Sequence, residues 1–219
     1  MTQRTKQHPL FARFYAGFAG PALEKAGITE HRRRLLAALS GEVVEIGAGN
    51  GLNFPYYPPE VQRLVAVEPE PRLRALAERQ AHAASVPAEL IDGRGEQLPF
   101  PDGSFDAAVA CLTLCSVADP HAALAELYRI LRPGGQLRFF EHVRADSSAM
   151  RRVQRVLDAT VWPLLNGGCH TGRDTQQAIA VAGFTLTGID RFAFPESRIP
   201  LPAATHLLGT AVRPAGDTP

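Results

Sequence analysis

The chain lacks an apolar run long enough to cross a membrane. No stretch of its 219 residues approaches the ~20 apolar residues of a transmembrane helix. The segment from Leu10 to Leu23 is apolar and aromatic, but Arg13 and Pro21 interrupt it, so we expect no signal peptide there. We interpret this segment as a lid or cap, with peripheral contact to a membrane as the alternative.

Strong charge of either sign is also missing. The sequence holds 23 Lys and Arg residues against 22 Asp and Glu residues, and the net charge of +1 does not favour a nucleic-acid partner. A basic run, Arg32-Arg33-Arg34, precedes the apolar segment 35–39 in a helical stretch. We therefore predict that this run forms a solvated helix face.

Cysteine is scarce. The three cysteines, Cys111, Cys115 and Cys169, have no metal-like spacing, and an odd count argues against a disulfide framework. We accordingly expect no metal site and a cytoplasmic protein. The hydrophobic content of 45% is ordinary for a globular chain, and 219 residues suit one α/β domain with small additions.

Strand and helix patterns alternate along most of the chain. Strands are predicted to end near Ile46 and to span 63–67, 87–91, 105–110 and 136–140, with helices over 70–84 and from Pro120 onward. A helix over 150–165, a helix over 175–182 and strands over 184–192 and 206–212 follow. This order predicts a doubly wound, mostly parallel seven-stranded sheet in one domain, residues 40–214. Residues 1–39 are predicted to form a helical cap of two helices, broken near Pro21 and Gly27.

A glycine-rich loop follows the first predicted strand. Residues 43–53 read Val-Val-Glu-Ile-Gly-Ala-Gly-Asn-Gly-Leu-Asn, and alternating glycines let the backbone turn sharply and approach a ligand. A dinucleotide-binding turn needs a third glycine where Leu52 stands. The acidic Glu45 suits a cationic ligand with an amino group rather than a phosphate.

The pattern E-x-G-x-G-x-G resembles motif I of the class I methyltransferases that use S-adenosylmethionine. The resemblance implies a Rossmann-like fold and S-adenosylmethionine as cofactor. It also implies that the loop binds this cofactor through Glu45, Gly47, Ala48, Gly49, Gly51 and Asn53.

A second acidic residue ends the next strand. The apolar run 64–67 ends at Glu68, about 20 residues after the glycine turn, where a carboxylate can accept hydrogen bonds from ribose hydroxyls. We predict that Glu68 and the adjacent Pro69 belong to the cofactor site.

The segment 93–105, Gly-Arg-Gly-Glu-Gln-Leu-Pro-Phe-Pro-Asp-Gly-Ser-Phe, resembles the adenine loop of small-molecule methyltransferases. Arg94 stands where that family often has an Asp that contacts the adenine amino group. The resemblance therefore implies adenine contacts from Glu96, Gln97 and the backbone at Gly95. We also assign Cys111 and Leu112, at the end of the fourth strand, to the cofactor site.

Four further segments resemble a narrower family, the alkyl thiol methyltransferases of the methyltransferase-like seven group and their bacterial relatives. They are residues 53–59, 112–117, 140–143 and 162–175. The resemblance implies methylation of a small, fairly apolar thiol. A phenol, quinone, lipid amine or natural product as acceptor remains an alternative. So does a protein that binds the cofactor without turnover, whereas Leu52 opposes an NAD-dependent oxidoreductase.

His142 is the predicted catalytic residue. It stands at the carboxyl end of the fifth strand, where ligands bind in such sheets, and could accept the proton of a thiol whose ordinary pKa is about 8.5. The acceptor is predicted to be a small molecule, and the oligomeric state is left open. The predicted substrate-lining residues are Tyr15, Cys115, Trp162, Cys169, His170 and His206.

Overall fold

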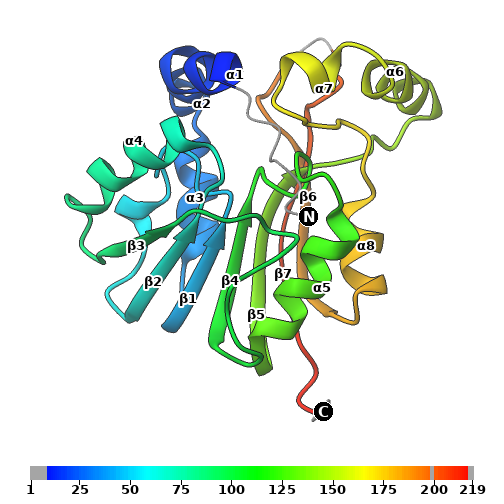
Figure 1. The fold of residues 1–219 in the computed structure, drawn as a ribbon. Helices are drawn as coiled ribbons and strands as arrows, with labels where there is room; N and C mark the ends of the chain where they lie inside the picture. The colour runs from blue at the N-terminus through cyan, green and yellow to red at the C-terminus, as the bar shows by residue number, and fades with distance from the viewer. Residues whose placement is uncertain (1–8, 198–199, 217–219) are drawn as a thin grey trace, which may run out of the picture.

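A seven-stranded sheet forms the centre of the molecule. The computed structural model describes residues 9–197 and 200–216, and its strands lie in the order β3-β2-β1-β4-β5-β7-β6 (Figure 1). The predicted sheet is confirmed, with β7 antiparallel to both neighbours and the other pairings parallel. The strands are β1 (Gly41–Ile46), β2 (Val61–Val67), β3 (Ala88–Ile91), β4 (Phe105–Cys111), β5 (Leu131–His142), β6 (Thr185–Ala193) and β7 (Thr205–Val212).

Helices cover both faces of the sheet. One face packs against α3 (Ile28–Leu36) and α4 (Pro71–Ala81), and the other against α5 (Pro120–Ile130) and α8 (Thr175–Val181). The neighbouring Phe139 and Phe140 of β5 are both fully buried but belong to opposite core layers, because successive strand side chains alternate between faces. The last four residues of β1 and of β2 and the last five of β4 are accordingly all buried, as in parallel sheets that are covered on both sides.

The N-terminal helical segment runs past Pro21, so the predicted break there is wrong. It comprises α1 (Pro9–Phe14), a π-helical turn (Tyr15–Ala19) and α2 (Gly20–Lys25). The N–H of Gly20 bonds the carbonyl of Tyr15, five residues earlier, which shifts the hydrogen-bond register. Pro21 then falls in the first turn of α2, where the missing N–H is tolerated. The predicted break at Gly27 is present, with φ at 96°.

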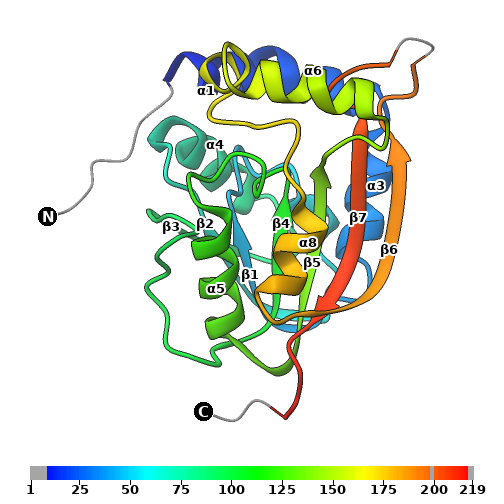
Figure 2. The same cartoon turned by 90° about the vertical axis from the view of Figure 1, so that its right-hand side faces the viewer.

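Two further helices lie with α1 above the carboxyl ends of the parallel strands (Figure 2). They are α6 (Ser148–Asp158) and α7 (Trp162–Leu165), where we predicted one helix over 150–165. Within residues 9–197 and 200–216, no helix is long and apolar enough to cross a membrane. The carboxyl edge of the sheet is thus roofed by α1 and α6.

Candidate functional site

The glycine loop lies against the end of β2. Gly47 and Ala48 donate their N–H groups to the carbonyl of Val67, at 2.8 and 3.3 Å. Gly47, Gly49 and Gly51 all have positive φ, and a Cβ at Gly47 would lie 2.4 Å from the side chain of Thr113. The loop therefore requires glycine both for its backbone conformation and for its close approach to β4.

Glu45 lies beneath this loop rather than at its surface. Its carboxylate is buried and accepts hydrogen bonds from Asn53 Nδ2 at 2.6 Å and Tyr57 Oη at 2.8 Å. Burial raises the pKa of Glu45 to about 7, against those two stabilising hydrogen bonds. Glu45 and Asn53 thus hold the loop from below.

Arg32 is buried, so the prediction of a solvated basic face is wrong at this residue. Its side chain is 3% exposed, pairs with Glu24 and donates to Asn53 Oδ1 at 2.7 Å, whereas Arg33 and Arg34 are exposed. Among the described residues, Nη2 of Arg32 has no hydrogen-bond partner. The guanidinium of Arg32 is therefore buried, and its Nη2 edge makes no hydrogen bond to the described residues.

The carboxylate of Glu68 joins β2 to the glycine loop. Its two oxygens accept the N–H groups of Gly49 and Glu70, both at 2.8 Å, and the side chain is buried. Burial raises the pKa of Glu68 despite these hydrogen bonds. Each carboxylate oxygen can accept a second donor, so a diol beside the loop can still bind here.

The predicted adenine loop is tied to the start of α5. Glu96 accepts the N–H of Ala118 at 2.8 Å and pairs with Arg94, while Gln97 is exposed. Gly95 is buried, and a Cβ there would lie 3.3 Å from Ile46. The carboxylate of Glu96 therefore holds the loop in place, and the loop backbone passes close to the end of β1.

The loop after β4 is held by a carboxylate that we did not predict. Glu141 is fully buried and accepts the N–H groups of Thr113, Leu114 and Cys115 at 2.8, 2.8 and 3.3 Å. Burial raises the pKa of Glu141 to about 8. Leu112, just before these residues, has a φ of 56°, a conformation that is strained for leucine and typical of functional sites.

His142 meets two of the three cysteines at the carboxyl edge. The Sγ atoms of Cys115 and Cys169 and a ring nitrogen of His142 lie within 4.8 Å of one another, so residues without metal-like spacing in the sequence are neighbours in the fold. His142 Nε2 is 3.1 Å from Cys169 Sγ, and Trp162 Nε1 donates to the same sulfur at 3.2 Å. In the described part of the chain, Nδ1 of His142 has no hydrogen-bond partner.

The thiols and the imidazole influence each other's protonation. The hydrogen bond between the thiols and the neighbouring imidazole lower the pKa of Cys115, which ionises first. Its hydrogen bond and its charge then raise the pKa of Cys169. Burial opposes charge on His142, but Cys115, Glu141 and Asp158 together outweigh it and raise the pKa of His142. The protonation states of the two thiols and the imidazole are therefore coupled.

His206 and His170 border this cluster without belonging to it. The ring of His206 lies 6.0 Å from that of His142, and burial lowers the pKa of His206 to about 4, which makes it a neutral aromatic neighbour. His170 donates its backbone N–H to the carbonyl of Cys115 at 2.8 Å. Its ring lies against the carbonyl of Gly168 and the guanidinium of Arg173.

Tyr15 of the N-terminal segment reaches the glycine loop. A Cβ at Gly49 would lie 3.8 Å from Tyr15 Cε1. Burial raises the pKa of Tyr15, although the nearby charge of Arg32 opposes this rise. The ring of Phe11 lies 5.7 Å from that of Tyr15, and a Cβ at Gly167 would lie 2.4 Å from the Phe11 ring. The segment thus contacts both the glycine loop and the loop that carries Cys169.

Comparison with known proteins agrees with the glycine loop and the acidic strand ends described above. A family profile described as a methyltransferase domain matches residues 44–139. The chain is 35% identical to thiol S-methyltransferase TMT1B of Rattus norvegicus over 184 residues, which cover 81% of this chain and 74% of that protein. The chain belongs to the S-adenosylmethionine-dependent methyltransferases.

Two further likenesses involve other methyltransferases. The chain is 36% identical to demethylmenaquinone methyltransferase of Thermus thermophilus over 104 residues, 48% of this chain and 47% of that protein. Among solved structures it resembles N-methyltransferase NodS from Bradyrhizobium japonicum in complex with S-adenosyl-L-homocysteine, with a TM-score of 0.69 and 20% identity over 94% of this chain and 97% of that chain. The predicted enzyme class and fold are confirmed.

The residues present fit S-adenosylmethionine, which is the methyl donor of the family. The glycine cradle leaves no room for side chains, Glu68 can bind a ribose diol, and the unused edge of Arg32 can bind a carboxylate. Sequence reasoning missed Arg32 and Glu141. Helical spacing from Ile28 through Arg32 to Leu35 was the available signal for Arg32, while nothing local distinguished Glu141.

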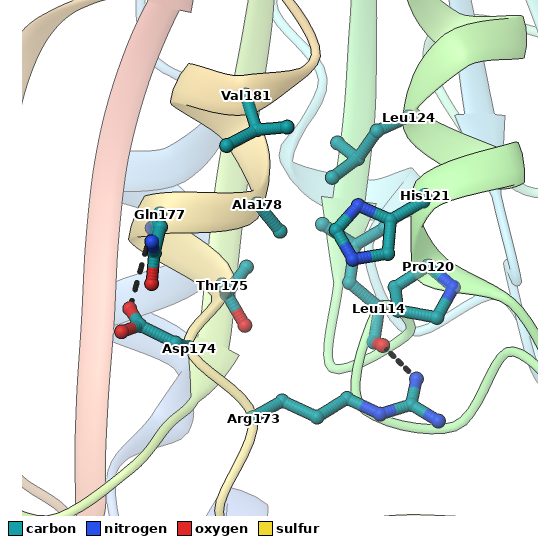
Figure 3. Close-up of a pocket in the computed structure, with 10 residues that line it drawn as sticks. All are labelled: Leu114, Pro120, His121, Leu124, Arg173, Asp174, Thr175, Gln177, Ala178 and Val181. Carbon is teal, nitrogen blue, oxygen red and sulfur yellow. Dashed lines mark hydrogen bonds between the residues drawn. The ribbon is translucent and has the colours of Figure 1, made fainter.

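The methyltransferase also has a cleft on the α5 and α8 side of the sheet, with a volume of about 350 Å³ (Figure 3). It is largely apolar, and Arg173 at its rim donates to the carbonyl of Leu114. It lies between the two helices and holds none of the predicted site residues that the structure describes. We assign no chemistry to it. Its lining residues are Leu114, Pro120, His121, Leu124, Arg173, Asp174, Thr175, Gln177, Ala178 and Val181.

Proposed function

We propose that this methyltransferase transfers the methyl group of S-adenosylmethionine to a small, fairly apolar thiol. The observation that carries the proposal is the environment of His142, whose Nε2 faces Cys169 Sγ while Nδ1 has no partner among the described residues. An imidazole with a hydrogen bond at one nitrogen and no partner at the other is suited to accept a proton. The likeness to a thiol S-methyltransferase over 81% of the chain supports the same acceptor class.

His142 is the proposed catalytic residue. When bound, S-adenosylmethionine supplies an electrophilic methyl group on a positively charged sulfur. His142 Nδ1 would take the proton of the acceptor thiol, so that the thiol sulfur could accept the methyl group that the bound cofactor would supply, with S-adenosylhomocysteine as the second product. The chain's main remaining task is to hold donor and acceptor in line, which can contribute roughly 7–11 kcal/mol.

The acceptor site that we propose is largely apolar. Cys115 and Cys169 are buried, Trp162 lies against Cys169, and neutral His206 stacks on Phe140 at 5.1 Å. Such walls exclude water and favour an alkyl group over a charged headgroup. His170, whose N–H holds Cys115, completes the proposed lining.

We assign the cofactor to the carboxyl ends of β1, β2 and β4. Glu68 would bind the ribose, the Gly95–Gln97 backbone the adenine, and Arg32 Nη2 the carboxylate of the methionine part. Tyr15 would cover the methionine part from the N-terminal cap. The remaining assigned residues shape the cradle: Glu45, Gly47, Ala48, Gly49, Gly51, Asn53, Pro69, Cys111 and Leu112.

A quinone or phenol is the second candidate acceptor. The relative that favours it is the demethylmenaquinone methyltransferase, but that match spans about half of this chain. A ring acceptor would place a hydroxyl or a carbon, rather than a sulfur, beside His142.

The test is release of S-adenosylhomocysteine with matched acceptors. A short alkyl thiol, a phenol and a primary amine of similar size are supplied separately to the purified chain with S-adenosylmethionine. We expect turnover with the thiol to exceed the other two by at least about tenfold, since a thiol loses its proton closer to neutrality than a phenol or an ammonium group does. Turnover with the phenol alone would replace the thiol proposal by the second candidate.

A further inference from the structure

Three soft donor atoms converge under the roof from three separate segments. Cys115 follows β4, His142 ends β5, and Cys169 follows α7, and all three side chains are buried. Ligand atoms around a tetrahedral Zn²⁺ stand about 3.5–3.8 Å apart, given bonds of about 2.3 Å to sulfur and 2.0–2.1 Å to nitrogen. The observed spacing, 3.1 Å for the Cys169–His142 pair and under 4.8 Å throughout, brackets that range.

We propose that Cys115, His142 and Cys169 form a binding site for a thiophilic divalent ion of the Zn²⁺ class. Two thiolates and an imidazole match the ligand preference of zinc, whereas Mg²⁺ and Ca²⁺ prefer oxygen. Binding releases the two thiol protons to solvent. Three protein ligands leave a fourth coordination position open to water or to a thiol.

The ligands are held in place by the surrounding chain. Glu141 accepts the N–H of Cys115 and of the two residues before it, and His170 donates to the Cys115 carbonyl, which ties the two cysteine-bearing loops together. Trp162 Nε1 already donates to Cys169 Sγ at 3.2 Å. Hydrogen bonds of this kind to ligand atoms orient metal ligands and raise affinity.

The ion and the proposed proton transfer compete for the same imidazole, a consequence that rests on the proposed function. An ion at Nε2 leaves the ring hydrogen on Nδ1, which can then donate but cannot accept. The ion would therefore inhibit methylation of a thiol, and its removal would restore it.

The site is tested with the reduced, metal-free full chain and Co²⁺ as a spectroscopic probe. We expect one Co²⁺ per chain, with intense near-ultraviolet absorption from sulfur-to-metal charge transfer that Zn²⁺ abolishes. Cys115→Ser, Cys169→Ser and His142→Gln should each weaken binding by about 100-fold or more. Cys111→Ser and His206→Gln are matched controls, because both residues are buried and lie outside the cluster. Far-ultraviolet circular dichroism checks that every variant is folded.

The absence of a one-to-one thiolate complex in the wild-type chain would overturn the metal site. Equal weakening by Cys111→Ser would overturn it too. The full proposal predicts that Zn²⁺ inhibits the wild type and that a chelator reverses this inhibition. In Cys169→Ser, Zn²⁺ should leave turnover equal to the rate of the same variant without metal. One-to-one binding in a chain that methylates no thiol would keep the site and contradict only the proposed function.

Discussion

Buried ionisable side chains are concentrated along the carboxyl edge of the sheet. Glu45, Glu68, Glu141 and His142 are all at least nine-tenths buried, each at or just after the end of its strand. The strand-end positions of Glu45, Glu68 and His142 were predictable, because the apolar runs before them are visible in the sequence. For Arg32, helical spacing from Ile28 and Leu35 was a signal of burial, but its partners Glu24 and Asn53 could not be predicted, because no local pattern connects them to it.

We expect Glu68 to contribute directly to binding of the cofactor. Glu68→Ala should weaken binding of S-adenosylhomocysteine between several-fold and about 100-fold, because hydrogen bonds to a charged carboxylate contribute roughly 1.5–3 kcal/mol. Calorimetry measures this loss, and Glu89→Ala, on exposed β3, is the matched control. Equal affinity in the Glu68 and Glu89 variants would remove Glu68 from the cofactor site.

Glu45 makes the stability of the cofactor-free chain depend on pH. Because burial raises its pKa to about 7 from an ordinary value of 4.5, the folded state binds the proton more tightly than the unfolded state. Its contribution to the free energy of unfolding is therefore full below pH 4.5 and is lost as pH rises through 7.

Glu45→Gln should remove this dependence and raise the free energy of unfolding at pH 8 by up to about 3 kcal/mol. The amide keeps one acceptor oxygen for Asn53, and its NH2 group can donate to the hydroxyl oxygen of Tyr57. Urea denaturation at pH 5 and pH 8 measures it. A variant that is no more stable than the wild type at pH 8 would contradict the account of this residue.

At the scale of elements, α6 shows how a predicted helix can pack in an unexpected way. Its apolar residues Val153 and Val156 are exposed, whereas Gln154 is fully buried. Gln154 accepts the N–H of Ala145 and donates to the carbonyls of three segments, so it joins α6 to the loops beside β5 and β7. Helical periodicity predicted the helix but could not predict which face is covered, because that depends on distant loops.

Gln154→Leu should lower the free energy of unfolding by about 2–4 kcal/mol, because several buried backbone groups lose their partner. Chemical denaturation measures the loss. Gln177→Leu, on the exposed side of α8, is the matched control and should change stability by less than about 0.5 kcal/mol. Similar losses in both variants would show that the polar contacts of Gln154 do not hold α6.

For the whole molecule, the N-terminal segment connects the two halves of the proposed site. Tyr15 lies over the glycine loop and Phe11 lies against Gly167, so one helical segment contacts the cofactor side and the acceptor side. The parallel sheet could be predicted from alternating strand and helix patterns. The contact of the N-terminal segment with both sides of the site could not be predicted, because it depends on residues about 150 positions apart in the sequence.

Tyr15→Ala should raise the dissociation rate of S-adenosylhomocysteine by about 10-fold, because the cap loses its contact with the loop. Stopped-flow competition measures the rate. Phe18→Ala, in the same segment but 65% exposed, should leave it unchanged. An unchanged rate in Tyr15→Ala would exclude this residue from covering the cofactor.

We propose that His142 accepts the proton of a thiol, and the turnover of a His142 variant tests this proposal most directly. The turnover of His142→Gln with a short alkyl thiol at pH 7 is compared with its affinity for S-adenosylhomocysteine, using exposed His82→Gln as control. We predict a fall in turnover of about 10²–10⁴-fold with affinity unchanged within about twofold. Turnover equal to that of the wild type would contradict the account.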